Sequence, residues 1–412
     1  MKYTKVETEI DLTPPLRGLS RTVRWKLKRT VPTVVDVTAS RSRTPTQIRR
    51  GKELPCHFHG SINDPPVRHG TKAMKIIEHQ AEGINSYTLV NNHHMNVTIM
   101  DWGATVTAIK THDKDGNFAN VVLGFDHYKD YITHRAFFGA TIARVAGVIK
   151  NAKWRHYELT QNFGKHHLNG GNMPQIAFEP WFLERKLQTR DQVGLVMQYI
   201  TLDGENGYPG TMTITAEFIL DNSGKFTITY TGKSDKPTLF NPTNHTYFNL
   251  SGDAVEPIDH EILKINADEY AALNKHNLPT GKLPWVTDSP FDFREPTTIG
   301  PQVAKIKGGL RHGFVLNKTP HPQVELLDRV SGRKVTLRTN APALVVSSAT
   351  NYRDDRYRLN GGKPMRSQLG ISLQPQVLPD AIHHKEFGSI IIPADVPVTY
   401  QTAYRFSNIY DV

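Results

Sequence analysis

From about residue 80 onward the chain is a succession of short runs of β-branched and aromatic residues, separated by turn-forming residues. In the segment 211–220 (TMTITAEFIL) apolar and polar residues alternate with a period near two, as a half-buried strand requires. Turn sequences such as 203–207 (DGENG) and 221–224 (DNSG) lie between the runs. Amphipathic helical windows are nearly absent, so the pattern predicts an all-β sandwich or barrel. The runs that carry the prediction are 87–90, 96–100, 195–202, 211–220, 226–231, 335–337 and 344–347.

The first residues have a different composition, and we predict two parts: a basic extended arm over residues 1–75 and a β-domain over residues 76–412. Residues 1–72 hold 15 Lys and Arg against 6 Asp and Glu, which is +9 of the total charge of +11. The arm is rich in Arg, Thr, Pro and Ser, and only the segment 31–37 could form a short strand. We expect its basic residues to bind a partner: Arg21, Arg24, Lys26, Lys28, Arg29, Arg41, Arg43, Arg49 and Arg50.

The arm has too little apolar surface to offset the conformational entropy lost on folding alone. We therefore expect it to lie on the β-domain itself, on an acidic protein surface or polymer such as microtubules, or on the RNA of a large particle. A mitochondrial presequence is the alternative, although Glu7, Glu9 and Asp11 are unusual in such peptides. No apolar run approaches the ~20 residues of a membrane span. These features favour a cytoplasmic location, with the cytoskeleton as one setting, and no membrane contact.

Histidine and cysteine give no metal site by spacing. The chain has one cysteine, Cys56, so it cannot form an internal disulfide. Cys56 lies beside His57 and His59, but one short loop supplies too few ligands for zinc, and an ordinary loop thiol is the simpler interpretation. The histidine pairs 93–94, 166–167 and 383–384 have no Cys or carboxylate at ligand spacing, which favours solvated loops. We expect neither a metal nor a cofactor.

The stretch 241–252 (NPTNHTYFNLSG) puts one histidine among asparagines and aromatics, and it resembles the aldose 1-epimerase (galactose mutarotase) family. Further segments resemble the same family in order and spacing from about residue 80 to 410. The resemblance implies a large antiparallel β-sandwich. These segments are 101–104 (DWGA), 120–128 (NVVLGFDHY), 138–146 (FGATIARVA), 167–171 (HLNGG), 203–210 (DGENGYPG), 290–294 (PFDFR) and 378–381 (LPDA).

The resemblance also implies a reaction, the interconversion of the α and β anomers of a free hexose without a cofactor. A base takes the proton of the anomeric hydroxyl while an acid protonates the ring oxygen. The family's acid histidine matches His245, which is retained. The family's base glutamate falls at Gln374 in 373–376 (LQPQ), and an amide cannot accept a proton at neutral pH.

The positions that the resemblance assigns to sugar contacts are all substituted. The sugar-binding aspartate falls at Arg311, which offers donors only. A second histidine falls at Asn169, an asparagine–arginine pair falls at Gly147 and Val148, and a glutamine falls at Val345.

We therefore expect a catalytically inactive epimerase homologue that serves as a structural or interaction subunit of a large assembly, anchored by its basic arm. In that interpretation His245, Asp292 and Asp380 belong to loop architecture. The first alternative is an active hexose or hexose-phosphate 1-epimerase with an altered site, in which Arg311 would favour an acidic sugar. A second alternative is a carbohydrate-binding module without turnover, for which Val148, Val345 and Arg311 are unfavourable with neutral hexoses.

Overall fold

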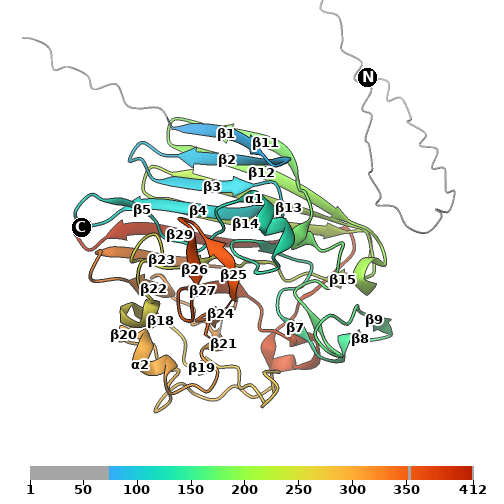
Figure 1. The fold of residues 1–412 in the computed structure, drawn as a ribbon. Helices are drawn as coiled ribbons and strands as arrows, with labels where there is room; N and C mark the ends of the chain where they lie inside the picture. The colour runs from blue at the N-terminus through green and yellow to red at the C-terminus, as the bar shows by residue number, and fades with distance from the viewer. Residues whose placement is uncertain (1–73, 351–353, 411–412) are drawn as a thin grey trace, which may run out of the picture. The chain divides into compact units, whose positions relative to one another are not determined.

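The computed structural model describes residues 74–350 and 354–410. Residues 1–73 lie outside this range. They include the nine candidate partner-binding residues of the basic arm, the segment 31–37, Cys56, His57 and His59. Nearly all the regular structure in the described residues is antiparallel β-strand, which confirms the predicted fold class (Figure 1).

The largest sheet has nine strands in the order β11-β12-β13-β14-β29-β23-β22-β18-β20. Its first four strands follow one another in the chain as hairpins, whereas β29 comes from the C-terminal end and joins them to β23. The strands are β11 (Phe182–Gln188), β12 (Gln192–Thr201), β13 (Met212–Asp221), β14 (Lys225–Ser234), β18 (Ile262–Ile265), β20 (Thr297–Thr298), β22 (Val324–Leu327), β23 (Arg333–Thr339) and β29 (Val398–Asn408).

Two further sheets have five strands each. The sheet β1-β2-β3-β4-β5 is a simple meander, and Figure 1 shows it as successive strands at the start of the described chain. Its strands are β1 (Lys75–Ala81), β2 (Ile84–Val90), β3 (Asn96–Met100), β4 (Thr105–His112) and β5 (Phe118–Asn120). The sheet β17-β27-β24-β21-β19 brings together segments that are far apart in the sequence. Its strands are β17 (Tyr247–Phe248), β19 (Glu269–Tyr270), β21 (Arg311–Val315), β24 (Ala343–Ser347) and β27 (Ile371–Gln376).

Short strand pairs and single helical turns complete the described chain. The pairs are β6 (Thr141–Ile142) with β16 (Thr243–Asn244), β7 (Val148–Ile149) with β10 (His167–Leu168), β8 (Lys153–Trp154) with β9 (Tyr157–Glu158), β15 (Thr238–Leu239) with β28 (Ile391–Ile392), and β25 (Asp354–Leu359) with β26 (Lys363–Met365). The two short α-helices are α1 (Tyr128–Thr133) and α2 (Ile299–Val303). Turns of 3₁₀ helix lie at Lys150–Ala152, Ile176–Phe178, Glu205–Gly207, Ile258–His260, Ala381–His383 and Lys385–Phe387.

Apolar residues alternate with polar ones in the sequence, and buried residues alternate with partly exposed ones in the structure, with the same period of two. Along β13 every second residue is buried, from Met212 to Leu220. These side chains join a core that also includes residues of the sheet β17-β27-β24-β21-β19. The run predicted at 226–231 is the centre of β14, which is longer because it pairs along its length with β13 and β29. Each of the other predicted runs also overlaps an observed strand, so the fold follows from burying one face of many short strands.

Candidate functional site

The sheet β17-β27-β24-β21-β19 turns one face to the core and the other to the candidate site. Lateral pairing aligns Tyr247 with Ser372, Ser372 with Ser347, and Ser347 with Arg311. The next row aligns Gln374 with Val345 and Val345 with Gly313. Residues two apart in a strand share a face, so both rows lie on the same side of the sheet. The opposite side carries residues buried in the core: Phe248, Phe314, Leu344, Val346, Ile371 and Leu373.

Three of the predicted site positions, Gln374, Val345 and Arg311, are therefore brought together on one sheet face. The same rows contain three hydroxyl groups that the sequence did not single out, those of Tyr247, Ser347 and Ser372. The sequence does hint at these hydroxyls, because each lies two residues from a predicted site position and residues two apart in a strand share a face. Recognising this hint requires the register between strands that are more than 100 residues apart, such as β17 and β27.

Gln374, at the position of the family's base, is buried and engaged with its own strand. Its Nε2 donates a hydrogen bond to Ser372 Oγ at 2.8 Å. The side chain therefore offers a carbonyl oxygen that can accept a hydrogen bond, but it cannot take up a proton.

His245 precedes β17 and is held through its backbone. Its N–H donates to the Ala140 carbonyl at 2.9 Å, and its carbonyl accepts from the Gly139 N–H at 3.1 Å. The imidazole stacks on Phe137 at 5.8 Å between ring centroids, and its buried Nδ1 has no hydrogen-bond partner among the described residues. Burial lowers the pKa of His245 to about 4, so the imidazole is neutral at pH 7 in the free protein.

Arg311 lies at the outer end of the hydroxyl row and is exposed. Its Nη2 donates to the Gly308 carbonyl at 2.7 Å, and no carboxylate of the described residues forms an ion pair with it. Burial lowers the pKa of the adjacent His312 to about 4, and the positive charge of Arg311 acts in the same direction. This end of the site therefore carries one fixed positive charge.

The other predicted positions, Gly147, Val148 and Asn169, lie together in the β7–β10 region. Asn169 Oδ1 accepts a hydrogen bond from the Gly147 N–H at 2.8 Å, and the Asn169 N–H donates to the Gly147 carbonyl at 3.0 Å. Asn169 is thus a loop-forming residue. Gly147 has a φ of +82°, and a Cβ there would lie 2.9 Å from Pro379, so the position is crowded as well as left-handed.

The segment after β27 touches both groups of site positions. Pro379 approaches Gly147, and Leu378 Cδ2 would lie 2.4 Å from a Cβ at Gly313. Asp380 follows, buried, and its Oδ1 accepts hydrogen bonds from the Lys150 N–H at 2.9 Å and from His383 at 2.6 Å. Asp380 therefore ties β27 to the β7 loop.

Asp292 also has a loop partner. Its two carboxylate oxygens accept hydrogen bonds from Arg294 Nε at 3.0 Å and from Arg294 Nη2 at 2.7 Å. The loop roles expected for Asp292 and Asp380 agree with these contacts.

The prediction of solvated histidine pairs is wrong for His167, and the expectation that the pair 383–384 has no carboxylate at ligand spacing is wrong as well. His167 is fully buried, with Nδ1 2.7 Å from the Thr160 carbonyl and Nε2 2.6 Å from the Tyr208 hydroxyl. His383 and His384 both face Asp380, at 2.6 Å and 3.4 Å. A contact with distant Tyr208 accompanies the burial of His167, whereas Asp380 reaches the other pair from three and four residues earlier in the chain. Among residues 74–350 and 354–410, no cluster of three or more His, Cys, Asp or Glu has metal-binding geometry.

Three histidines, buried His167 and half-buried His245 and His312, predict a pH dependence of stability. Burial lowers the pKa of His167, His245 and His312 to about 4 in the folded protein, against about 6.5 in an unfolded chain. Between these values the unfolded state binds more protons, so each histidine lowers the free energy of unfolding as pH falls from 6.5 to 4, by at most about 1.4 kcal/mol per pH unit. Urea titrations at intervals from pH 7.5 to 4.5 measure this slope.

The control for this prediction compares the pH dependence of stability between the native chain and its histidine variants. Burial raises the pKa of Glu261 to about 8, and that carboxyl changes stability in the opposite sense over much of the same range. The double variant His167→Gln with His245→Gln should show a weaker loss of stability on acidification than the native chain, whereas exposed His93→Gln should not. Equal slopes for all three proteins would contradict the prediction.

Known proteins are similar to this chain in sequence and in fold. The profile of the family described as Aldose 1-epimerase matches residues 85–405. The galactose mutarotase of Homo sapiens is 30% identical over 323 residues, which cover 76% of this chain and 91% of that protein. The maltose epimerase of Levilactobacillus brevis is 26% identical over 343 residues, covering 79% and 96%. The crystal structure of galactose 1-epimerase from Lactobacillus acidophilus superposes with a TM-score of 0.71 at 27% identity, covering 81% of this chain and 98% of the other.

Proposed function

This chain belongs to the aldose 1-epimerase family, and from that premise we propose that it is a member without the carboxylate base. It does not exchange the anomers of neutral hexoses at an enzymatic rate, and it serves as an interaction subunit of a larger assembly.

The observation that carries the proposal is the state of Gln374. The family's reaction needs a group that takes the anomeric proton, and the amide at this position has no basic lone pair at neutral pH. Its amide nitrogen is already bound to Ser372 Oγ at 2.8 Å. In the two rows of residues on the site face, no side chain is a carboxylate.

The surrounding positions support the same proposal. Arg311 presents donors where a neutral sugar hydroxyl needs an acceptor, and Val345 presents no polar group. The side-chain oxygen of Asn169 already accepts a hydrogen bond from the Gly147 N–H. A neutral hexose on this face would leave several of its hydroxyls without partners, which is costly when they are buried. Polarimetry of the purified chain with galactose tests this part of the proposal.

The assembly part of the proposal rests on composition. The excess of nine positive charges in residues 1–72 suits an acidic polymer, with microtubules as the case to examine first, and RNA of a large particle as another outcome. The corresponding location is the cytoplasm, on the cytoskeleton, with mitochondria as the alternative. None of the described helices is long and apolar enough to cross a bilayer.

Deletion of residues 1–72 is expected to remove co-sedimentation with microtubules, because the remaining residues carry 35 Lys and Arg against 33 Asp and Glu and have little net attraction for an acidic surface. Sedimentation of the full chain and of residues 73–412 measures it. Replacement of Arg21, Arg24, Lys26, Lys28 and Arg29 by Gln should weaken pelleting in the same direction, and added salt should do so too. Unchanged pelleting of the deletion variant would contradict the proposal.

An active epimerase of hexoses or hexose phosphates with an altered site is a second candidate. The names of the relatives, galactose mutarotase and maltose epimerase among them, favour this candidate over the first. His245 is retained, and exposed Arg311 could pair with a phosphate. Anomer exchange of glucose 6-phosphate that is lost in His245→Ala and in Arg311→Gln, but kept in Arg338→Gln, would establish it.

A further inference from the structure

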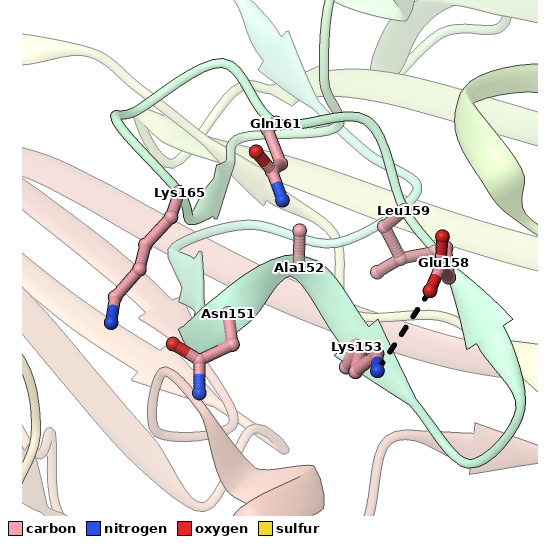
Figure 2. A pocket seen from close by; sticks show the side chains of 7 residues that line it. All are labelled: Asn151, Ala152, Lys153, Glu158, Leu159, Gln161 and Lys165. Carbon is pink, nitrogen blue, oxygen red and sulfur yellow. Dashed lines mark ion pairs between the residues drawn. The ribbon is translucent and has the colours of Figure 1, made fainter.

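A hollow lies just beyond β7, next to the region that holds Gly147, Val148 and Asn169 and apart from the sheet face that holds Gln374. It is a half-open hollow of about 630 Å³ between the turn at Lys150–Ala152, the β8–β9 hairpin and the loop 159–165. Figure 2 shows its lining: Asn151, Ala152, Lys153, Glu158, Leu159, Gln161 and Lys165.

The frame of this hollow is fixed by backbone hydrogen bonds. The Leu159 N–H donates to the Ala152 carbonyl at 2.7 Å, and the Asn151 N–H donates to His166 Nδ1 at 2.9 Å. Ala152 and Leu159 are buried and form an apolar floor. The Lys150 N–H donates a hydrogen bond to the buried carboxylate of Asp380. Asp380 follows β27 in the chain, so this bond joins the hollow to β27. The hollow is therefore preformed, as small-molecule sites usually are.

The rim is basic. Lys153 and Lys165 both line the hollow, and Glu158 is the one carboxylate among its lining residues. Lys153 Nζ lies 3.8 Å from Glu158 Oε1, but the two side chains are 62% and 79% exposed, so this pair is weak and leaves the ammonium available. Lys165 forms no ion pair with any described residue.

The surrounding segment reinforces this charge. Residues 150–166 carry four cationic side chains against one carboxylate, which is +3: Lys150, Lys153, Arg155 and Lys165 against Glu158. The pKa of neighbouring His166 is lowered, first by burial and next by Lys165, which is consistent with a positive local potential.

Polar uncharged groups complete the lining. In Figure 2 Gln161 points from its loop toward the segment that carries Asn151 and Lys153. Side-chain amides can both donate to and accept from hydroxyl groups, and lysine ammonium groups bind phosphate and carboxylate oxygens. The volume lies within the range of sites for small ligands.

We propose that this hollow binds a monosaccharide-sized polyol that carries a phosphate or a carboxylate. The anionic group lies at the basic rim, within reach of Lys153 or of Lys165 on the opposite side of the hollow, and Asn151 and Gln161 contact the hydroxyls. The site is separate from the Gln374 face, so it does not depend on whether that face is catalytic.

Isothermal titration calorimetry on the full chain tests the proposal with four probes: glucose 6-phosphate, glucuronate, glucose and inorganic phosphate. We expect the first two to bind and glucose to bind at least ~10-fold more weakly, because it lacks the charge-assisted contacts. The double variant Lys153→Gln with Lys165→Gln should weaken glucose 6-phosphate binding by about 10-fold or more. Both lysines are exposed, so the unfolding midpoint of the double variant should stay at the native value.

Two control variants separate this hollow from other basic sites. Lys305→Gln removes an exposed lysine from the turn after α2, and Arg338→Gln removes an exposed arginine from β23. Neither should change the affinity. Absence of binding by both anionic sugars, binding unaffected by the double lysine variant, or binding abolished by either control variant would each overturn the proposal. Equal affinity for inorganic phosphate and glucose 6-phosphate would overturn the polyol part.

Discussion

The purified chain is expected to leave the approach of α-galactose to anomeric equilibrium close to the spontaneous rate. Loss of a general base costs ~10²–10⁴-fold in rate, and the substituted sugar contacts add to this through weaker binding. The Homo sapiens galactose mutarotase, assayed by polarimetry at the same protein concentration, supplies the positive control. Acceleration by the native chain that disappears in His245→Ala would contradict the proposal and favour the second candidate.

Restoring the carboxylate tests whether the base is the missing element. Gln374→Glu should raise the rate above that of the native chain, by up to about 10²-fold, because it restores a proton acceptor on the site face. The matched control is Gln376→Glu, since Gln376 is buried on the same face of the same strand, two residues further on. Equal rates for the two variants would mean that the remaining substitutions, and not the lost base, limit the chemistry.

Replacement of Arg144 is expected to destabilise the fold strongly, because this side chain joins three separate segments in the interior. Arg144 is 1% exposed, and its Nη2 donates to the Pro209 carbonyl, to the Gly210 carbonyl at 2.8 Å and to Thr238 Oγ1 at 2.9 Å. The guanidinium lies over the Tyr208 ring at 5.2 Å, and burial lowers its pKa to about 10. It therefore fixes the 208–210 turn and strand β15 to the segment before β7.

Arg144→Ala should lower the free energy of unfolding by about 3–5 kcal/mol, because it leaves two buried carbonyls without donors and opens a cavity. Urea denaturation measures this loss. Arg144→Lys should recover only part of it, since one ammonium cannot reproduce the planar fork. Exposed Arg311→Ala is the control, with an expected change within about 0.5 kcal/mol. A loss below about 1 kcal/mol for Arg144→Ala would mean that water replaces the guanidinium contacts.

The long strands were predictable from the sequence, and the short ones were not. A ten-residue strand such as β13 shows five cycles of alternation, whereas β6, β7 and β16 have two residues each and no period to detect. These short pairs are formed by backbone hydrogen bonds between loops, which local composition does not encode.

The site was predictable only in part, for the same reason. The family resemblance located Gln374, Arg311 and His245, but not the hydroxyl row formed by Tyr247, Ser372 and Ser347. That row exists because β17, β27 and β24 pair in one register. Arg144 also escaped notice, because a lone arginine in a sequence gives no sign that it is buried.

Strand β27 carries the candidate site on one side and the core on the other, in alternate residues. Leu373 and Ile371 pack in the interior, while Ser372, Gln374 and Gln376 face the site. All six residues of β27 are buried, but substitutions at the even-numbered positions change the groups offered to the site, whereas those at Ile371 and Leu373 change the packing of the core. A strand of this kind separates two requirements along one short segment, because the groups that decide the chemistry of the site alternate with the side chains that fill the core.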